Sequence, residues 1–148
     1  VDTEDYLAYV HDLPLEVYIQ PDLQLRDILL SLSQRKWIFT NADKDHAKRV
    51  LKVLGVSDCF EGILDVRAIG FLCKPEIESY QRALALAKEK KPENCILLDD
   101  SLRNLVPAKD LGFTTVLVGS NGSNPAVDYT IDSIHELPQS LPDLWSKR

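Results

Sequence analysis

Methionine is absent from this 148-residue chain, and cysteine is scarce, occurring only as Cys59, Cys73 and Cys95. An odd number of cysteines without a CxxC spacing argues against a disulfide framework or a structural zinc site. This cysteine usage, together with the lack of a secretory signal pattern, favours a reducing compartment, so we expect a cytoplasmic protein. Because the chain starts at Val1 and has no methionine, we also expect a processed chain or a fragment.

Long apolar runs are missing as well, because none approaches the roughly 20 residues that a helix needs to cross a bilayer. Basic residues are outnumbered: 17 lysines and arginines stand against 23 aspartates and glutamates, and the formal net charge is −6. This balance argues against a protein that binds nucleic acid or an anionic membrane surface. A local basic pocket for a small phosphorylated ligand is compatible with it.

The residues that are present fit one globular domain, with 45% hydrophobic and 27% charged residues. Short apolar runs alternate with stretches in which apolar residues recur at helical spacing. We predict strands at 36–39, 61–66, 94–100, 114–119 and 129–131, and helices from Pro21 to Leu32, Asp43 to Leu54, Pro75 to Ala87 and about 101 to Leu111. The alternation predicts βαβ units and an α/β fold, a Rossmann-like parallel sheet with helices on both faces.

Two prolines constrain the predicted helix boundaries. Pro75 suits the first turn of the helix after "CKPE", because its missing N–H has no partner there. Pro107 must also lie in the first turn of its helix, because an interior proline removes a backbone hydrogen bond. Gly55 and Gly112 fit the positions just past the ends of two helices.

Polar side chains follow the predicted strands at the points where the strands end. The first strand ends at Thr40 and Asn41, the loop after the second reaches Lys74, and the third ends at Asp99 and Asp100. In a parallel sheet these ends share one edge, where ligands bind. A hydroxyl, a lysine and the N–H groups of a following helix can contact phosphate oxygens, and adjacent carboxylates suit Mg²⁺. The set predicts a site for a phosphate ester and a divalent metal.

Each of these residues also has a structural alternative. Thr40 and Asn41 could cap the following helix, and Lys74 could lie on solvated surface. Asp99 and Asp100 could be one helix cap and one exposed acid. The adjacent acids are the most specific feature, because a buried strand rarely ends on two like charges without a counterion.

The motifs resemble those of the haloacid dehalogenase (HAD) superfamily of phosphohydrolases. "WIFTN" is similar to its second motif, "CKPE" to its third and "ILLDDSLRN" to its fourth. From about Leu7 to Leu137 the chain further resembles the pyrimidine 5′-nucleotidase branch. The resemblance implies that residues 1–20 are the trailing end of a helical cap and that 21–148 form a partial Rossmann-like core.

The resemblance also implies an activity, the Mg²⁺-dependent hydrolysis of phosphomonoesters such as nucleoside 5′-monophosphates through an aspartyl-phosphate. Thr40 would bind the substrate phosphate with help from Asn41. Lys74 would hold the phosphate and the charge of the nucleophile. The expected partner is therefore a small phosphorylated substrate. The resemblance to the pyrimidine 5′-nucleotidase branch implies a pyrimidine nucleotide.

For the metal, the resemblance implies Asp100 as the main Mg²⁺ ligand, with Asp99 and Asn104 as a further ligand or as support. The family's nucleophile, the first aspartate of a DxDxT motif after the first strand, has no counterpart here. The "DKD" at 43–45 opens a helix and lacks a preceding strand of its own. Without that central strand we expect a chain that is weakly stable or associates, and that lacks normal turnover.

Two alternatives stay open. The substrate could be another small phosphate ester such as a sugar phosphate, because the cap selects the substrate and most of the cap is missing. The chain could also be a non-catalytic fragment that binds phosphate or a partner. The sequence leaves the oligomeric state undecided.

Overall fold

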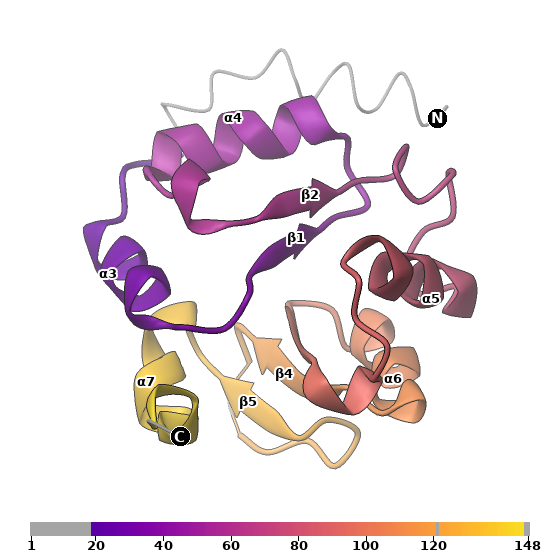
Figure 1. Ribbon diagram of the computed structural model, residues 1–148. Coiled ribbons are helices and arrows are strands. Elements are labelled where there is room, and N and C mark those ends of the chain that lie inside the picture. The colour runs from indigo at the N-terminus through magenta and orange to yellow at the C-terminus, as the bar shows by residue number, and fades with distance from the viewer. Residues whose placement is uncertain (1–18, 121, 147–148) are drawn as a thin grey trace. The chain divides into compact units, whose positions relative to one another are not determined.

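The computed structural model describes residues 19–120 and 122–146. The chain divides into two compact units, one that ends at Phe71 and one that begins at Leu72 (Figure 1). Each unit has its own parallel sheet, with strand order β1-β2 in the first and β3-β4-β5 in the second. Within the described ranges, no helix has the length and apolar character that a membrane span requires.

The first unit is built from a strand–helix–strand segment preceded by a helix. Its elements are α3 (Leu23–Ser31), β1 (Trp37–Phe39), α4 (Lys44–Leu54), the 3₁₀ turn η1 (Ser57–Cys59) and β2 (Gly62–Leu64). The two strands pair in parallel, with Ile38 opposite Ile63. Because α4 connects them, this segment is the βαβ unit that the sequence predicts.

Short polar side chains begin the helices of the first unit. Asp22 accepts a hydrogen bond from the backbone N–H of Leu25 at 2.9 Å and caps α3. Asp43 accepts one from the N–H of His46 at 2.9 Å and caps α4. Gly55 ends α4 with a φ of 79°, a conformation that glycine adopts without strain. Both helices lie where the apolar spacing places them.

The core of the first unit lies between its helices and one face of the sheet. Leu51 and Val56 are buried there, and the half-buried Ile38 and Ile63 pack against them from the strands. On the strand register, Trp37 stands opposite Gly62. The register explains the glycine, because a Cβ at position 62 would lie 2.5 Å from Cζ3 of the Trp37 ring.

The second unit contains the remaining strands and helices. They are α5 (Ile77–Leu86), the 3₁₀ turn η2 (Pro92–Asn94), β3 (Ile96–Asp99), α6 (Leu102–Leu111), β4 (Thr114–Val118), β5 (Tyr129–Ile131), the 3₁₀ turn η3 (Ile134–Glu136), α7 (Leu137–Ser140) and the 3₁₀ turn η4 (Pro142–Trp145). All three strands run parallel, and β4 pairs with a neighbour on each edge. The structure thus confirms the predicted α/β class with parallel, Rossmann-like strand connections.

Both prolines occupy positions that differ from the prediction. Pro75 lies in the turn before α5, because the extended residue Glu76 caps a helix that begins only at Ile77. Pro107 lies in the middle of α6 rather than in its first turn. An interior proline costs roughly 3 kcal/mol. The neighbouring Leu105 and Ala108 are fully buried, and their packing offsets this cost.

Strands β1 and β3 are less buried than their apolar sequences suggest. Every residue of both strands is half-buried, whereas Val116 in β4 is fully buried. Among the described residues, β1 pairs only with β2 and β3 only with β4, so each is an edge strand. The predicted cap remnant stays a prediction, because residues 1–18 lie outside the described ones.

Candidate functional site

A buried ion pair lies at the carboxyl end of β3. Lys74 Nζ donates a hydrogen bond to Oδ2 of Asp99 at 2.9 Å, and the two side chains are only 7% and 8% exposed. Asp99 also accepts from the backbone N–H of Ser101 at 2.9 Å. The side-chain amide of Asn104 lies 3.3 Å from Oδ2 of the same carboxylate. Two of the residues that the sequence singled out, Lys74 and Asn104, therefore converge on the carboxylate of a third, Asp99.

The elements of the second unit explain this convergence. Asp99 is the last residue of β3, and Asn104 lies in the first turn of α6. The loop before α5 carries Lys74. Tyr80 on α5 is fully buried, and its hydroxyl donates a hydrogen bond to the backbone carbonyl of Asn104. This bond fixes α5 against the start of α6, and thereby the lysine loop against the strand end.

Sequence reasoning placed Tyr80 on the apolar face of its helix but assigned it no partner. The signal that could have found one is chemical, because a buried tyrosine needs a hydrogen-bond partner for its hydroxyl. Desolvation, with a smaller contribution from the charge of Asp99, raises the pKa of Tyr80 to about 12. Its hydroxyl is therefore a permanent donor at neutral pH.

The surroundings of Asp99 keep it ionised. Burial alone would raise its pKa. The hydrogen bond and the charge of Lys74 lower the pKa, as do the hydrogen bonds that Ser101 and Asn104 donate, and together they outweigh the effect of burial. The pKa of Asp99 consequently lies below the ordinary 3.8. A carboxylate and an ammonium group are thus held together in the protein interior, next to the strand end.

Asp100 differs from its neighbour. It is exposed, and its carboxylate makes no ion pair with any residue that the structure describes. Because the oxygens of Asp99 already accept protein donors, Asp100 is the carboxylate left for a hard cation, which prefers oxygen ligands and retains waters. The described residues contain no group of three or more His, Cys, Asp or Glu side chains placed to hold a metal. The assignment of Asp100 as the metal ligand, with Asp99 and Asn104 as a further ligand or as support, therefore stays a prediction.

Thr40 and Asn41 follow β1 in the first unit. Oγ1 of Thr40 accepts the N–H of Ala42 at 3.0 Å, which leaves its hydroxyl proton for an acceptor. The alternative that Thr40 or Asn41 caps α4 is wrong, because Asp43 is the cap. Thr40 thus retains the donor that phosphate binding requires, and Asn41 beside it is exposed.

The expectation that N–H groups at the start of α4 bind phosphate needs correction. The N–H of Lys44 donates to Oδ2 of Asp65 at 2.8 Å, and the N–H of His46 donates to Asp43. Asp65 is only 4% exposed and also accepts the N–H of Ala68 at 2.8 Å. Sequence reasoning missed Asp65, which falls inside the predicted strand 61–66 but directly follows the shorter observed strand β2. Two buried acids thus occupy this helix terminus.

The full predicted site spans both units of the chain. Lys74, Asp99 and Asn104 meet within the second unit, whereas Thr40 and Asn41 belong to the first. A joint site formed by all of these residues therefore stays a prediction.

The chain matches the sequence pattern of a known family. The sequence pattern of the haloacid dehalogenase-like hydrolases matches residues 2–112. The chain belongs to this family. It is also 33% identical over 129 residues to Phosphate metabolism protein 8 of Saccharomyces cerevisiae, a match that covers 78% of this chain and 40% of that protein. This HAD chain thus spans about two fifths of its yeast relative's length.

Solved structures of the family share the fold. A HAD phosphatase from Thermococcus onnurineus superposes with a TM-score of 0.67 at 23% identity, over 86% of this chain and 64% of that one. The HAD-hydrolase YfnB from Bacillus subtilis, described as bound to magnesium, superposes with a TM-score of 0.65 at 19% identity, over 78% and 52%. At such identities the likeness establishes the fold alone.

Proposed function

We propose that this chain is part of a Mg²⁺-dependent phosphomonoester hydrolase that acts on nucleoside 5′-monophosphates. The observation that carries the proposal is the buried pair of Lys74 and Asp99 beside the exposed Asp100 at the end of β3. A cation fixed in the interior at a strand end suits a phosphoryl oxygen. A neighbouring carboxylate with unengaged oxygens suits Mg²⁺.

In this proposal each residue has a defined task. Lys74 binds an oxygen of the substrate phosphate, and Asp99 holds the lysine in place and keeps it charged. As the family resemblance implies, the hydroxyl of Thr40 would donate a hydrogen bond to a substrate phosphate, and Asp100 would hold the metal. Mg²⁺, when bound, neutralises charge that develops on the phosphoryl oxygens.

The covalent step requires an aspartate that this sequence does not supply in the family's DxDxT context. We propose that the nucleophile belongs to a longer protein, of which this chain is the part that binds phosphate and metal. The partial coverage of the yeast relative supports this view. The missing nucleophile also favours a second candidate function, a non-catalytic fragment that binds phosphate or a partner.

The substrate class rests on a separate part of the sequence. The stretch "HDLPLEVYIQPDLQLRDILLSL" resembles the pyrimidine 5′-nucleotidase branch. The names of the relatives point to phosphate metabolism and to a phosphatase, without naming a nucleotide. We therefore propose UMP as the first substrate to test and a sugar phosphate as its competitor.

The test is Mg²⁺-dependent release of phosphate from UMP and from a hexose phosphate, by this chain and by a version extended upstream. We expect release by the extended chain only, with UMP preferred, and its loss in Asp100→Asn. Asp110→Asn is the matched control, because Asp110 is also an exposed acid of the second unit. Equal activity of the two variants would contradict the assignment of Asp100. Phosphate binding by this chain, with no release by either version, would favour the non-catalytic function.

A further inference from the structure

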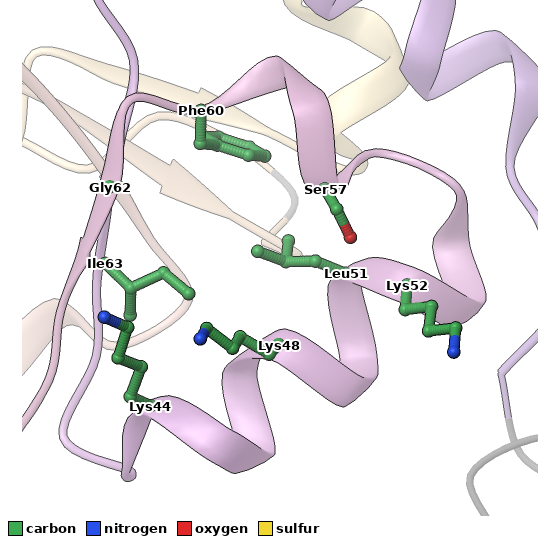
Figure 2. A pocket seen from close by; sticks show the side chains of 8 residues that line it. All are labelled: Lys44, Lys48, Leu51, Lys52, Ser57, Phe60, Gly62 and Ile63. Carbon is green, nitrogen blue, oxygen red and sulfur yellow. The ribbon is translucent and has the colours of Figure 1, made fainter.

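The first unit contains a pocket of about 370 Å³ between α4, η1 and β2 (Figure 2). Its volume falls in the range of about 300–1,000 Å³ that is typical of small-molecule sites. None of its lining residues belongs to the phosphate and metal set described above. They are Lys44, Lys48, Leu51, Lys52, Ser57, Phe60, Gly62 and Ile63.

Three of the lining residues are lysines on one face of α4. Lys44, Lys48 and Lys52 follow one another at intervals of four, so they lie on the same side of the helix. All three are exposed. Like charges at this spacing destabilise a helix, and Lys44 also opposes the helix dipole at the N-terminus. Lys52, in the last turn, suits the helix dipole, so the local conflict lies at Lys44 and Lys48, and such conflicts are expected at functional or strained sites.

The acids next to the pocket do not neutralise these lysines. Asp58 forms a two-point ion pair with Arg26, at 2.5 and 2.9 Å. Oε2 of Glu61 lies 3.6 Å from Nη1 of Arg35 and forms an ion pair with it. Among the described residues, no carboxylate forms an ion pair with a lysine of the pocket. The rim of the pocket therefore carries three lysines without an ion-pair partner in the described part of the chain, although the buried Asp43 and Asp65 lie at the start of α4.

An apolar wall lies beside the charged groups. Leu51 is buried, and Phe60 and Ile63 are half-buried at the same core cluster. Figure 2 shows the side chains of Lys44 and Lys48 reaching toward Ile63, while Lys52 lies farther along the helix and extends away from them. Cationic groups at one end and an apolar wall beside them suit a ligand with an anionic head and an apolar body.

We propose that this pocket binds a small aromatic phosphate or phosphonate. Its anionic group would lie between the ammonium groups of Lys44 and Lys48, with its ring against Leu51 and Phe60. The hydroxyl of Ser57 would be a further donor. This proposal is independent of the proposed hydrolase, because it uses none of the residues assigned to that reaction.

The test is a titration of the isotope-labelled chain with phenylphosphonate, which has no ester bond to hydrolyse, followed by NMR. We expect amide shifts within residues 44–63 and tighter binding of phenylphosphonate than of inorganic phosphate. Lys44→Gln/Lys48→Gln should weaken binding by about tenfold or more, as the loss of charge-assisted hydrogen bonds predicts. Glutamine is a good helix former, so the helix should persist.

The matched control is Lys90→Gln/Lys91→Gln, which changes the net charge equally at two exposed lysines of the second unit. It should leave the affinity unchanged. Three results would overturn the proposal: equal weakening by both double variants, shifts confined to Lys74 and residues 99–104, or equal affinity for inorganic phosphate. Binding of an acidic peptide in place of phenylphosphonate would also overturn it.

Discussion

Replacing Lys74 by methionine should destabilise the second unit strongly, because it leaves Asp99 as an uncompensated charge in the interior. Both side chains of the pair are less than a tenth exposed, at 7% and 8%. Removal of one partner of a buried ion pair costs about 3–5 kcal/mol. Ser101 and Asn104 still donate to Asp99, so we expect the lower end, about 3 kcal/mol. That is a large share of the roughly 5–15 kcal/mol that stabilise a typical domain.

The assay is urea unfolding followed by circular dichroism at neutral pH. Lys109→Met is the matched control, since Lys109 pairs with Asp128 at 3.3 Å but both side chains are about a third exposed, at 37% and 34%. An exposed pair contributes about 0–1 kcal/mol. In Lys74→Met, the further change Asp99→Asn should restore about 1–2 kcal/mol, because a neutral amide needs no cation. Equal destabilisation by the two lysine variants would refute the reasoning.

The pH dependence of the same variants gives a second check. The pKa of Asp99 is lowered in the folded chain, so its contribution to stability is present above about pH 3.8 and is lost as the pH falls further. In Lys74→Met, burial is no longer outweighed by the lysine, and the pKa of Asp99 should rise. The stability difference between wild type and variant should therefore shrink as the pH falls through the acid range.

Three further predictions concern single contacts. Tyr80→Phe should cost about 0.5–1.5 kcal/mol in urea unfolding, because it removes the hydrogen bond from the Tyr80 hydroxyl to the Asn104 carbonyl. Gly62→Ala should cost about 1–3 kcal/mol by the same assay, because the new methyl would overlap the ring of Trp37. Asp58 should titrate at about 2 by NMR, because Arg26 donates to it, and Arg26→Gln should return that pKa toward 3.8. Its contribution to stability is lost as the pH falls between these values.

Each of these predictions has a result that would contradict it. Tyr129→Phe, at a tyrosine that is 43% exposed, should leave stability unchanged, and an effect equal to that of Tyr80→Phe would contradict the buried bond. For Gly62→Ala, unchanged stability would show that the ring moves aside freely. For Asp58, an unshifted titration curve would show that its pair with Arg26 does not persist in solution.

The positions of the elements could be predicted because local signals agree with the fold. Ala47 and Leu51 lie four residues apart on the buried face of α4, and Gly55 ends that helix where predicted. Pro107 could not be placed from sequence, because its position depends on how α6 packs. The full burial of Leu105 and Ala108 is a tertiary property that outweighs the local preference of proline.

The candidate site could be predicted as a set of residues but not as a set of contacts. Lys74 and Asp99 lie 25 positions apart, and only the folded second unit brings them to 2.9 Å. The role of Tyr80 depends on a backbone carbonyl of Asn104, which no side-chain motif reveals. The role of Asp65 could not be predicted for a similar reason, because its partners are the backbone N–H groups of Lys44 and Ala68.

The mismatch between sequence and burial in β1 and β3 carries its own information. Continuous apolar runs are typical of parallel strands that are covered on both faces and paired on both edges. Trp37 to Phe39 and Ile96 to Leu98 are such runs, yet each strand has one described neighbour and is half-buried. Val116 and Leu117 in the doubly paired β4 are buried, with exposed fractions of 0% and 6%. The apolar sequences of β1 and β3 are therefore typical of strands that are more deeply buried than these two are among the described residues.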